Sequence, residues 1–424
     1  MFLFNSPVFQ IPRGTRDFTP EDMQKRNIIE EKIRNTFEIF GYKEIQTPVF
    51  EHLDLFTAKS GEGIINEIYS FNDKGGRQLA LRPELTAPVI RFYVDKLQMR
   101  PKPLKLFYFG NCYRYDRPQK GRYREFKQAG CEIIGVETPE SIAELIALAY
   151  NILSNIGLKE INLKIGNLKI LSKIFDKIKL TDDQRKHLIP LIDKSMDEDI
   201  YQALIDFNIP AKQASDFLSV LNTNKIEEIK KYIGQDANED IDKLNQVLEF
   251  LINSFKIKQS EIKIGIVRGL DYYDNIVFEI EAPNLGAEKQ ICGGGTYELL
   301  SLFGGRQTPT AGFAIGFDRS IIALETEGFE FPEQTIDFYV IPVNKDMIAK
   351  SIEISKILRE NGQKTEIDLL RRGIGKSLKH ADSLNAKKAV ILGPKELEEE
   401  SITVRDLKSG NQEKIKINDL NKVF

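Results

Sequence analysis

A short basic segment contains the residues whose types and spacing most clearly suggest chemistry. Residues 114–124 carry a single acid, Asp116, and five basic side chains, namely Arg114, Arg117, Lys120, Arg122 and Arg124. Pro118 and Gly121 indicate a turn within the segment. In many proteins such a loop is only a solvated turn. Guanidinium groups, however, also bind phosphate oxygens in a planar, bidentate geometry and keep their charge at neutral pH, so the segment suits a polyanion.

The sequence on either side of this segment predicts the scaffold that holds it. Residues 104–115 and 124–135 read as two strands joined by the basic loop, which makes a long antiparallel hairpin. On the return strand, Gln128, Gly130 and Glu132 share one face because side chains alternate along a strand. The glycine leaves a gap in this polar face where a flat ligand could lie against the backbone. The alternative is a polar strand face that meets only water.

The N-terminal part of the chain predicts a helix followed by an irregular strand. Thr19 and Pro20, followed by two acids, are typical of a helix start, and Gly41 marks the end of the helix. Residues 43–50 predict a strand, and Pro48 within it indicates an edge or an irregularity.

The middle of the chain changes character. Ile, Leu and Lys recur at helical spacing over residues 168–258, which predicts an α-helical insertion. Strands are expected again over residues 262–267, 276–281 and 311–316. Together with the hairpin, these strands predict an α+β core over residues 1–325, with an antiparallel sheet flanked by helices.

The C-terminal part predicts a separate small domain. Residues 326–334 are acidic with Pro and Gly and form a plausible linker. Residues 335–424 then alternate as β-α-β-α-β, which predicts a compact α/β domain. A basic helix is expected there, carrying Arg371, Arg372 and Lys376. Charged helical faces are usually solvated.

Composition excludes several classes of function. The chain has 60 Lys+Arg against 63 Asp+Glu, so the global basic bias of a pure nucleic-acid binder is absent. The three Cys have no CxxC spacing and the three His are scattered, which favours a reducing compartment and argues against zinc. No apolar run is long enough to cross a membrane. No complete P-loop, GxGxxG, HEXXH or GxSxG pattern occurs, so any phosphate chemistry is of another kind.

Five segments, in this order, resemble the histidyl-tRNA synthetase family over nearly the whole chain. They are RGTRD (13–17), LRPELTA (81–87), YRYDRPQKGRYR (113–124), RGLDYY (268–273) and GFAIGFDR (312–319). The resemblance implies a class II synthetase fold: an antiparallel sheet flanked by helices, with a helical insertion and a C-terminal α/β anticodon-binding domain. It also implies a histidine–tRNA ligase that works with ATP and Mg²⁺ in the cytoplasm, as a homodimer.

The resemblance implies roles for three arginines at the nucleotide. Arg114 would contact the α-phosphate of ATP, and Arg319, in the first turn of a helix, would contact the γ-phosphate. Arg268 would reach the α-phosphate beside the histidine carboxylate, so Arg268 and Arg114 are the expected catalytic residues. Glu84 and Thr86 are also expected to contact ATP.

The resemblance further implies a histidine pocket and two RNA contacts. Glu84, Thr86, Gln128 and Glu132 would hold the α-amino group, Arg268 the carboxylate side, and Tyr272 and Tyr273 the imidazole. Arg117 and Gln119 match positions expected to meet the acceptor end of tRNA(His), and Arg371, Arg372 and Lys376 would meet the anticodon.

One segment departs from the family pattern, and three other functions compete. In the family, a glycine-rich loop is usually followed by Arg-Tyr-Asp-Gly-Leu. This chain keeps the loop glycines at 293–295 but continues with residues 296–300, TYELL, which affects one wall of the expected histidine pocket. The competing functions are a histidine-sensing regulatory subunit of ATP phosphoribosyltransferase, another class II synthetase, and an RNA-binding sensor with a synthetase-like body. The phosphate-binding arginines, the anticodon domain and the segment 268–273 favour the histidine enzyme.

Overall fold

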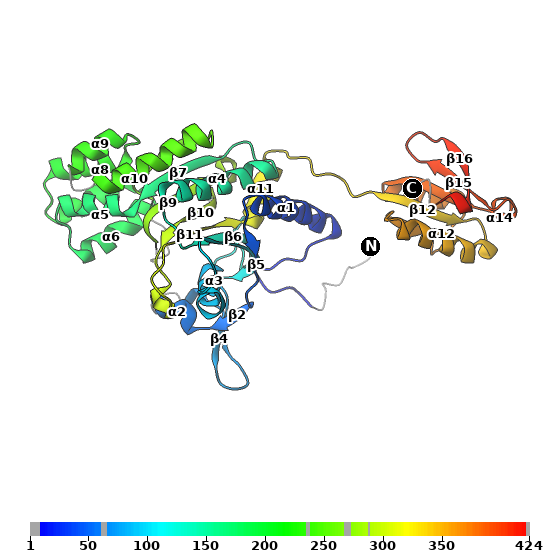
Figure 1. Cartoon of the computed structure of the whole chain (residues 1–424), viewed down its shortest axis with the longest axis horizontal. Coiled ribbons are helices and arrows are strands. Elements are labelled where there is room, and N and C mark those ends of the chain that lie inside the picture. Colours follow the sequence, from blue (N-terminus) through cyan, green and yellow to red (C-terminus); the bar gives the residue numbers. More distant parts are fainter. Residues whose placement is uncertain (1–8, 61–65, 235–237, 267–272, 287–288, 421–424) are drawn as a thin grey trace, which may run out of the picture. The chain divides into compact units, whose positions relative to one another are not determined.

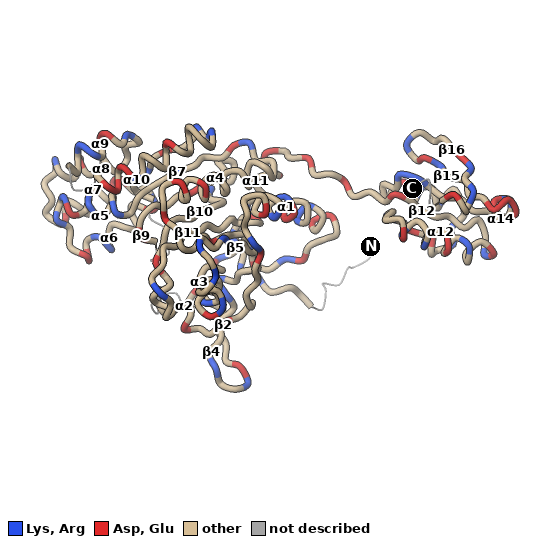
Figure 2. The backbone as a smooth tube through the Cα atoms, viewed as in Figure 1, with Lys and Arg blue, Asp and Glu red and all other residues tan. Residues whose placement is uncertain are grey.

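The computed structural model of the chain describes residues 9–60, 66–234, 238–266, 273–286 and 289–420. The chain divides into two compact units, Met1–Glu330 and Phe331–Phe424 (Figure 1). Basic and acidic side chains are interspersed over both units (Figure 2), in keeping with the formal net charge of −3.

The first unit is built on an eight-stranded sheet with the order β1-β5-β6-β11-β10-β9-β7-β8. The strands are β1 (Lys43–Glu44), β5 (Leu104–Tyr113), β6 (Glu125–Ile134), β7 (Asn162–Asn167), β8 (Ser260–Ile262), β9 (Tyr273–Glu281), β10 (Gln290–Tyr297) and β11 (Thr310–Gly316). All neighbours run antiparallel except the outermost pairs, β1 with β5 and β7 with β8. The hairpin predicted around the basic loop is confirmed as β5 and β6.

Helices α1 (Pro20–Ile39), α4 (Pro139–Ile156) and α11 (Phe317–Thr326) lie along one side of this sheet (Figure 1). The predicted start of α1 is confirmed, because Thr19 and Asp22 form a reciprocal capping box with Pro20 in the first turn. Phe37 of α1 stacks on Phe107 of β5 with ring centroids 4.9 Å apart, so this face of the sheet is closed by aromatic packing.

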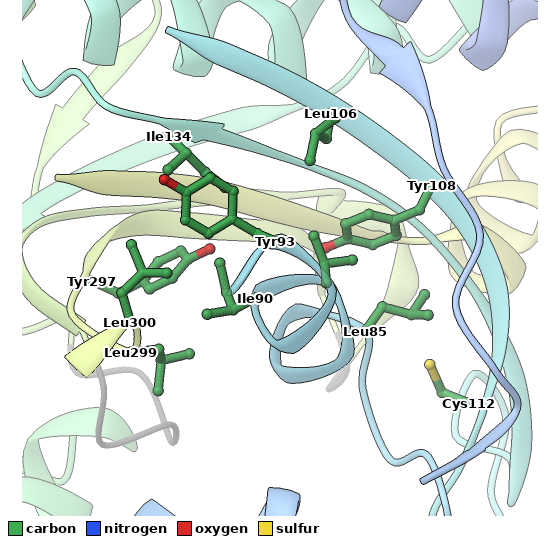
Figure 3. Close-up of a cluster of buried hydrophobic side chains, with 11 residues drawn as sticks. Leu85, Ile90, Tyr93, Leu106, Tyr108, Cys112, Ile134, Tyr297, Leu299 and Leu300 are labelled. Atoms are coloured by element: carbon green, nitrogen blue, oxygen red, sulfur yellow. The ribbon is translucent and has the colours of Figure 1, made fainter. Parts of the chain in front are cut away.

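The other face of the sheet carries α3 (Thr86–Phe92), the π-helical turn η2 (Tyr93–Leu97) and a hydrophobic cluster. Leu106 and Tyr108 flank Phe107 in the strand and therefore point to this opposite face. Figure 3 shows them packed around α3 together with Tyr297 of β10. Beside α3 lie α2 (Asp54–Ser60) and a three-stranded sheet of β2 (Phe50–His52), β4 (Gln78–Leu81) and β3 (Ser70–Asn72).

The helices predicted for residues 168–258 are present and gather beyond β7 and β9 (Figure 1). They are α5 (Leu168–Lys177), α6 (Asp182–Asp193), α7 (Asp197–Asp206), α8 (Ala211–Asn222), α9 (Ile226–Ile233) and α10 (Asn238–Glu249), followed by the π-helical turn η4 (Phe250–Ser254).

The second unit is a five-stranded sheet with the order β13-β12-β14-β15-β16. Its strands are β12 (Ile336–Pro342), β13 (Thr365–Ile367), β14 (Ala386–Leu392), β15 (Ser401–Asp406) and β16 (Gln412–Lys416). Its helices are α12 (Ile348–Glu360), α13 (Ile374–Ser383) and α14 (Pro394–Glu398). The predicted β-α-β-α-β order is confirmed by the parallel strands β13, β12 and β14. The antiparallel strands β15 and β16 were not predicted.

Several sequence-based expectations were wrong. Residues 43–50 do not form one strand, because the chain leaves β1 after Glu44 and starts β2 only at Phe50, beyond Pro48. The strand expected over 262–267 is instead the short β8, which ends at Ile262. The three glycines before Thr296 were expected in a loop, but they lie in the central strand β10.

Candidate active site

A cavity of about 370 Å³ opens on the α3 face of the sheet, where β6, β10, β11 and the start of α11 meet the basic loop. Its size falls within the range of small-molecule sites. Its lining includes six of the predicted residues, namely Glu84, Thr86, Arg114, Gln128, Tyr273 and Arg319. Side chains that are far apart in the sequence are thus brought to one face of one sheet.

Glu132 lies behind this lining and has no exposed surface. The Tyr108 hydroxyl donates to its Oε1 over 2.8 Å, and the Tyr297 hydroxyl donates to its Oε2 over 2.5 Å. Both tyrosine hydroxyls point towards one another in Figure 3. Burial raises the pKa of Glu132 to about 8, although the two hydroxyls pull it down. A carboxyl group with this pKa is mostly protonated at pH 7.

The gap at Gly130 does not hold a ligand, contrary to the prediction. Gly130 is paired with Tyr108 in the neighbouring strand, and a Cβ on Gly130 would lie 2.7 Å from the Tyr108 ring and hydroxyl. The missing side chain therefore makes room for Tyr108, which holds Glu132. Gly312, paired with Glu132 in β11, plays a similar part, because a Cβ there would lie 1.7 Å from Glu132 Oε2.

Glu84 and Thr86 form the edge of the cavity at the start of α3. The Glu84 carboxylate accepts the backbone N–H of Thr86 over 2.6 Å and that of Ala87 over 2.9 Å. Burial raises the pKa of Glu84, opposed by these two hydrogen bonds and by the charge of Arg114. The nearby charge of Glu84 also raises the pKa of Glu132, although burial is the larger cause. One acid in the cavity lining, Glu84, and one buried behind it, Glu132, therefore influence each other electrostatically.

The two described arginines of the predicted nucleotide site are held by backbone carbonyls. Arg114 donates from Nε to the carbonyl of Pro83 over 2.9 Å. Arg319, in the first turn of α11 as predicted, donates to the carbonyls of Gly121 and Gln290 over 2.9 and 2.8 Å. Arg319 therefore ties the turn of the basic loop to the first residue of β10.

Asp318 is a residue of this region that the sequence analysis did not single out. It lines the cavity and is only 4% exposed. It accepts from Arg26 over 2.6 Å, from Arg16 over 2.9 Å and from the backbone N–H of Lys127 over 2.7 Å. The position of Asp318 directly before Arg319, in the segment 312–319, was a signal in the sequence. Its partners Arg16 and Arg26 lie about 300 residues away along the chain, so no local sequence pattern could identify them.

The N-terminal segment around Arg16, which pairs with Asp318, also contacts the basic loop. The Arg16 guanidinium lies 3.4 Å from the centroid of the Tyr123 ring. The Arg124 backbone N–H donates to the carbonyl of Gly14 over 2.9 Å. Gly14 has φ +87° and packs so closely that a Cβ would lie 2.8 Å from Arg124. Residues 13–17 thus brace one side of the loop.

The other residues predicted for the first unit differ in what the structure describes of them. Arg117 and Gln119 belong to the loop but, among the described residues, are not part of the cavity lining; Gln119 and Arg122 close its turn with two backbone hydrogen bonds. Arg268 and Tyr272 lie outside the described residues. Tyr273 lines the cavity and meets Tyr297 edge-on, with centroids 6.3 Å apart.

The segment that departs from the family pattern forms part of the wall. Thr296 is fully buried and Tyr297 holds Glu132. Leu299 and Leu300 are each 2% exposed and belong to the hydrophobic cluster around α3. The bulky leucine at 299 is thus accommodated in the core.

In the second unit, Arg371 and Arg372 do not lie on the basic helix as predicted, because α13 begins only at Ile374. Arg372 pairs with the buried Asp368 over 2.9 Å, Arg371 has φ +54°, and Lys376 is exposed in the first turn of α13.

No group of three or more His, Cys, Asp or Glu side chains within the described ranges could hold a metal ion. Cys112, Cys131 and Cys292 are buried free thiols. Of the helices that the structure describes, none has both the length and the apolar composition needed to cross a membrane.

Comparison with known proteins gives consistent matches. The family model for histidyl-tRNA synthetase matches residues 14–319, and the model for an anticodon binding domain matches residues 337–424. The histidine–tRNA ligase of Methanocaldococcus jannaschii is 43% identical over 97% of this chain and 99% of that protein. That of Archaeoglobus fulgidus is 42% identical over 95% and 96%. The crystal structure of the S. aureus histidyl-tRNA synthetase superposes with a TM-score of 0.74 and 31% identity, covering 98% of this chain and 100% of that one.

Proposed function

Because the chain belongs to the histidyl-tRNA synthetase family, we propose that it is a class II histidine–tRNA ligase. It activates L-histidine with ATP to give histidyl-adenylate and pyrophosphate, and then transfers histidine to the 3′ end of tRNA(His). The observation that carries the proposal is a cavity in which two arginines meet the polar residues Glu84 and Gln128, with the buried acid Glu132 nearby.

The activation step needs positioning and charge stabilisation more than proton transfer. The histidine carboxylate is already a nucleophile, and it attacks the α-phosphorus while pyrophosphate leaves. Arg114 and Arg268 stabilise the negative charge on the α-phosphate oxygens, and Arg319 binds the γ-phosphate. The backbone contacts of Arg114 and Arg319 support this assignment, since a guanidinium fixed through Nε is already oriented before the nucleotide binds.

Histidine binds between the acids and the tyrosines. Glu84, Thr86, Gln128 and Glu132 hold the positive α-amino end, Arg268 the carboxylate, and Tyr272 and Tyr273 lie along the imidazole. A cationic ligand favours the ionised form of Glu132, whose pKa lies near 8 in the free protein. Binding of histidine at pH 7 therefore ionises Glu132 and releases a proton. Glu84 and Thr86 also border the nucleotide.

Mg²⁺ enters as the complex with ATP. The cavity acid Asp318 is already paired with Arg16 and Arg26, and Glu84 caps α3. Mg²⁺ commonly keeps several waters and is held mainly by substrate phosphates, which fits a cavity whose described carboxylates Asp318 and Glu84 already have partners.

The two units contact different parts of the tRNA. Arg117 and Gln119 on the basic loop meet the acceptor end, and Arg371 and Lys376 in the second unit meet the anticodon arm. Arg372 serves the same surface by pairing with the buried Asp368. Phosphate contacts fix the register of the RNA, and contacts to base edges specify it.

The active protein is a cytoplasmic homodimer. The small sheet beside α3 supports the dimer, because Phe50 and Phe71 are in edge-on contact and are 52% and 44% exposed. Apolar rings exposed together are typical of protein interfaces.

Amino-acid-dependent ATP–pyrophosphate exchange, run with each of the twenty amino acids, tests the proposal. Exchange is expected with histidine, and replacing Arg114 with alanine should lower the exchange rate about 10²–10³-fold. Absence of exchange with any amino acid, together with retained histidine binding, would favour a histidine-sensing regulatory protein. Exchange with a different amino acid would favour another class II synthetase.

A further inference from the structure

Two adjacent leucines of the second unit have side chains that are largely exposed to solvent. Leu369 is 80% exposed and Leu370 is 73% exposed. The next most exposed large apolar side chain described in that unit is Ile352, at 54%. Single exposed leucines are common on protein surfaces, but two in succession at these exposures leave an apolar patch without cover.

The loop that carries the leucines is held in one conformation. Asp368, only 4% exposed, accepts the backbone N–H groups of Leu370 and Arg372 over 3.0 and 3.1 Å. It also accepts from the Arg372 guanidinium over 2.9 Å and from the Ser377 hydroxyl. The leucines are therefore presented by a fixed turn, and a ligand that binds them loses little free energy in ordering the loop.

The position and charge of the loop match a nucleic acid. It follows β13, an edge strand that runs parallel to β12, which in turn runs parallel to β14. Ligands of parallel sheets bind beyond the carboxyl ends of the strands. Residues 369–381 include Arg371, Arg372, Lys376 and Lys379 and contain no acid. Apolar side chains can pack against the flat faces of extruded bases, while neighbouring cations hold the phosphates.

From these features we infer that Leu369 and Leu370 form the platform on which unpaired bases of the RNA lie, flanked by Arg371 and Lys376 at the phosphates. Arg372 does not contact the RNA directly in this arrangement: it holds Asp368 and so positions the loop. The inference deepens the proposed function, on which it rests, by assigning the apolar part of RNA recognition to a loop that contains no aromatic residue.

The test compares the full-length double variant Leu369→Ser/Leu370→Ser with wild type and with Ile352→Ser, an exposed apolar control on α12 of the same unit. Binding is measured to a hairpin transcript of the tRNA(His) anticodon arm and to a fully paired RNA of the same stem. The double variant should bind the hairpin about tenfold more weakly, with little change for the paired RNA. The control should stay within about twofold, as surface substitutions usually do.

Salt dependence separates the apolar contribution from the ionic one. The leucine variant should keep the wild-type dependence of log Kd on log[salt], because no ion pair is removed. Arg371→Gln/Lys376→Gln should flatten the slope by about 0.7 for each single-strand phosphate that the variant no longer neutralises. Hairpin affinity unchanged in the leucine variant would overturn the inference. So would a change in sedimentation mass with RNA binding intact, since the leucines would then form a protein interface.

Histidine-dependent pyrophosphate exchange in the same preparations keeps the two proposals distinguishable. Exchange should be equal in wild type and in the leucine variant, because the activation step takes place in the first unit. If the wild-type protein binds the hairpin through the leucines but shows no histidine-dependent pyrophosphate exchange, the proposed function is contradicted. The inference that the leucines bind RNA would still hold in that case.

Discussion

Replacing Glu132 with glutamine should stabilise the ligand-free first unit at alkaline pH and remove histidine activation. The carboxyl group is fully buried, and its pKa rises from the ordinary 4.5 to about 8. A raised pKa means that the folded state binds a proton that the unfolded chain has already lost. The contribution of this group to stability is therefore full below pH 4.5 and falls as the pH rises towards 8.

The size of the effect follows from those two pKa values. At 1.36 kcal/mol per pKa unit, the carboxyl costs the folded state about 1 kcal/mol at pH 5 and between about 4 and 5 kcal/mol at pH 8.5. Glutamine has nearly the same shape, can accept one tyrosine hydroxyl and has no charge to bury. The variant should therefore gain about 4 kcal/mol relative to wild type between these two pH values.

Urea unfolding of both proteins at pH 5 and pH 8.5, followed by circular dichroism, measures this gain. Glu31→Gln, at an exposed position on α1, is the matched control and should show little pH-dependent difference. Exchange with histidine should fall at least about 10²-fold in Glu132→Gln. An equal stability difference at the two pH values, or an activity close to wild type, would refute the reasoning about a buried neutral acid.

Three further substitutions test other parts of the site. Gly130→Ala should destabilise the first unit by about 1–3 kcal/mol and raise the KM for histidine, because the new methyl group collides with Tyr108; unchanged urea midpoints would contradict this packing. Arg319→Lys should lower the exchange rate about 10²-fold and raise the KM for ATP, since lysine is not a planar fork; steady-state exchange kinetics measure both. Arg16→Ala should remove the brace on Asp318 and raise the KM for tRNA in aminoacylation more than the KM for ATP in exchange; equal effects on both would argue against a role in holding the loop.

Features with local causes could be predicted from the sequence. The start of α1 is determined by Thr19 and Asp22 within a single turn, and the hairpin of β5 and β6 by alternation on both sides of one basic turn. Arg319 was correctly placed in the first turn of a helix because the strand before it ends at Gly316. Each of these features depends on residues only a few positions apart.

Features that depend on cross-strand neighbours could not be predicted. The gap at Gly130 is filled by Tyr108, whose register opposite it appears only once the strands pair. The glycines of β10 suggested a loop, yet a central strand tolerates them where backbone packs closely against backbone. Arg372 was expected on a basic helix, but it pairs with Asp368 four residues before it. That pairing depends on the burial of Asp368, which the sequence does not reveal although the two residues are close along the chain.

The floor of the cavity has a consequence for engineering its selectivity. At Gly312, which lines the cavity, a methyl group would collide with Glu132. Main chain therefore forms this surface, and point substitutions cannot reshape it in small steps. Attempts to make the protein accept an unnatural amino acid should instead randomise side chains at the rim, such as Tyr273 and Gln128, and leave the glycines of the two central strands untouched.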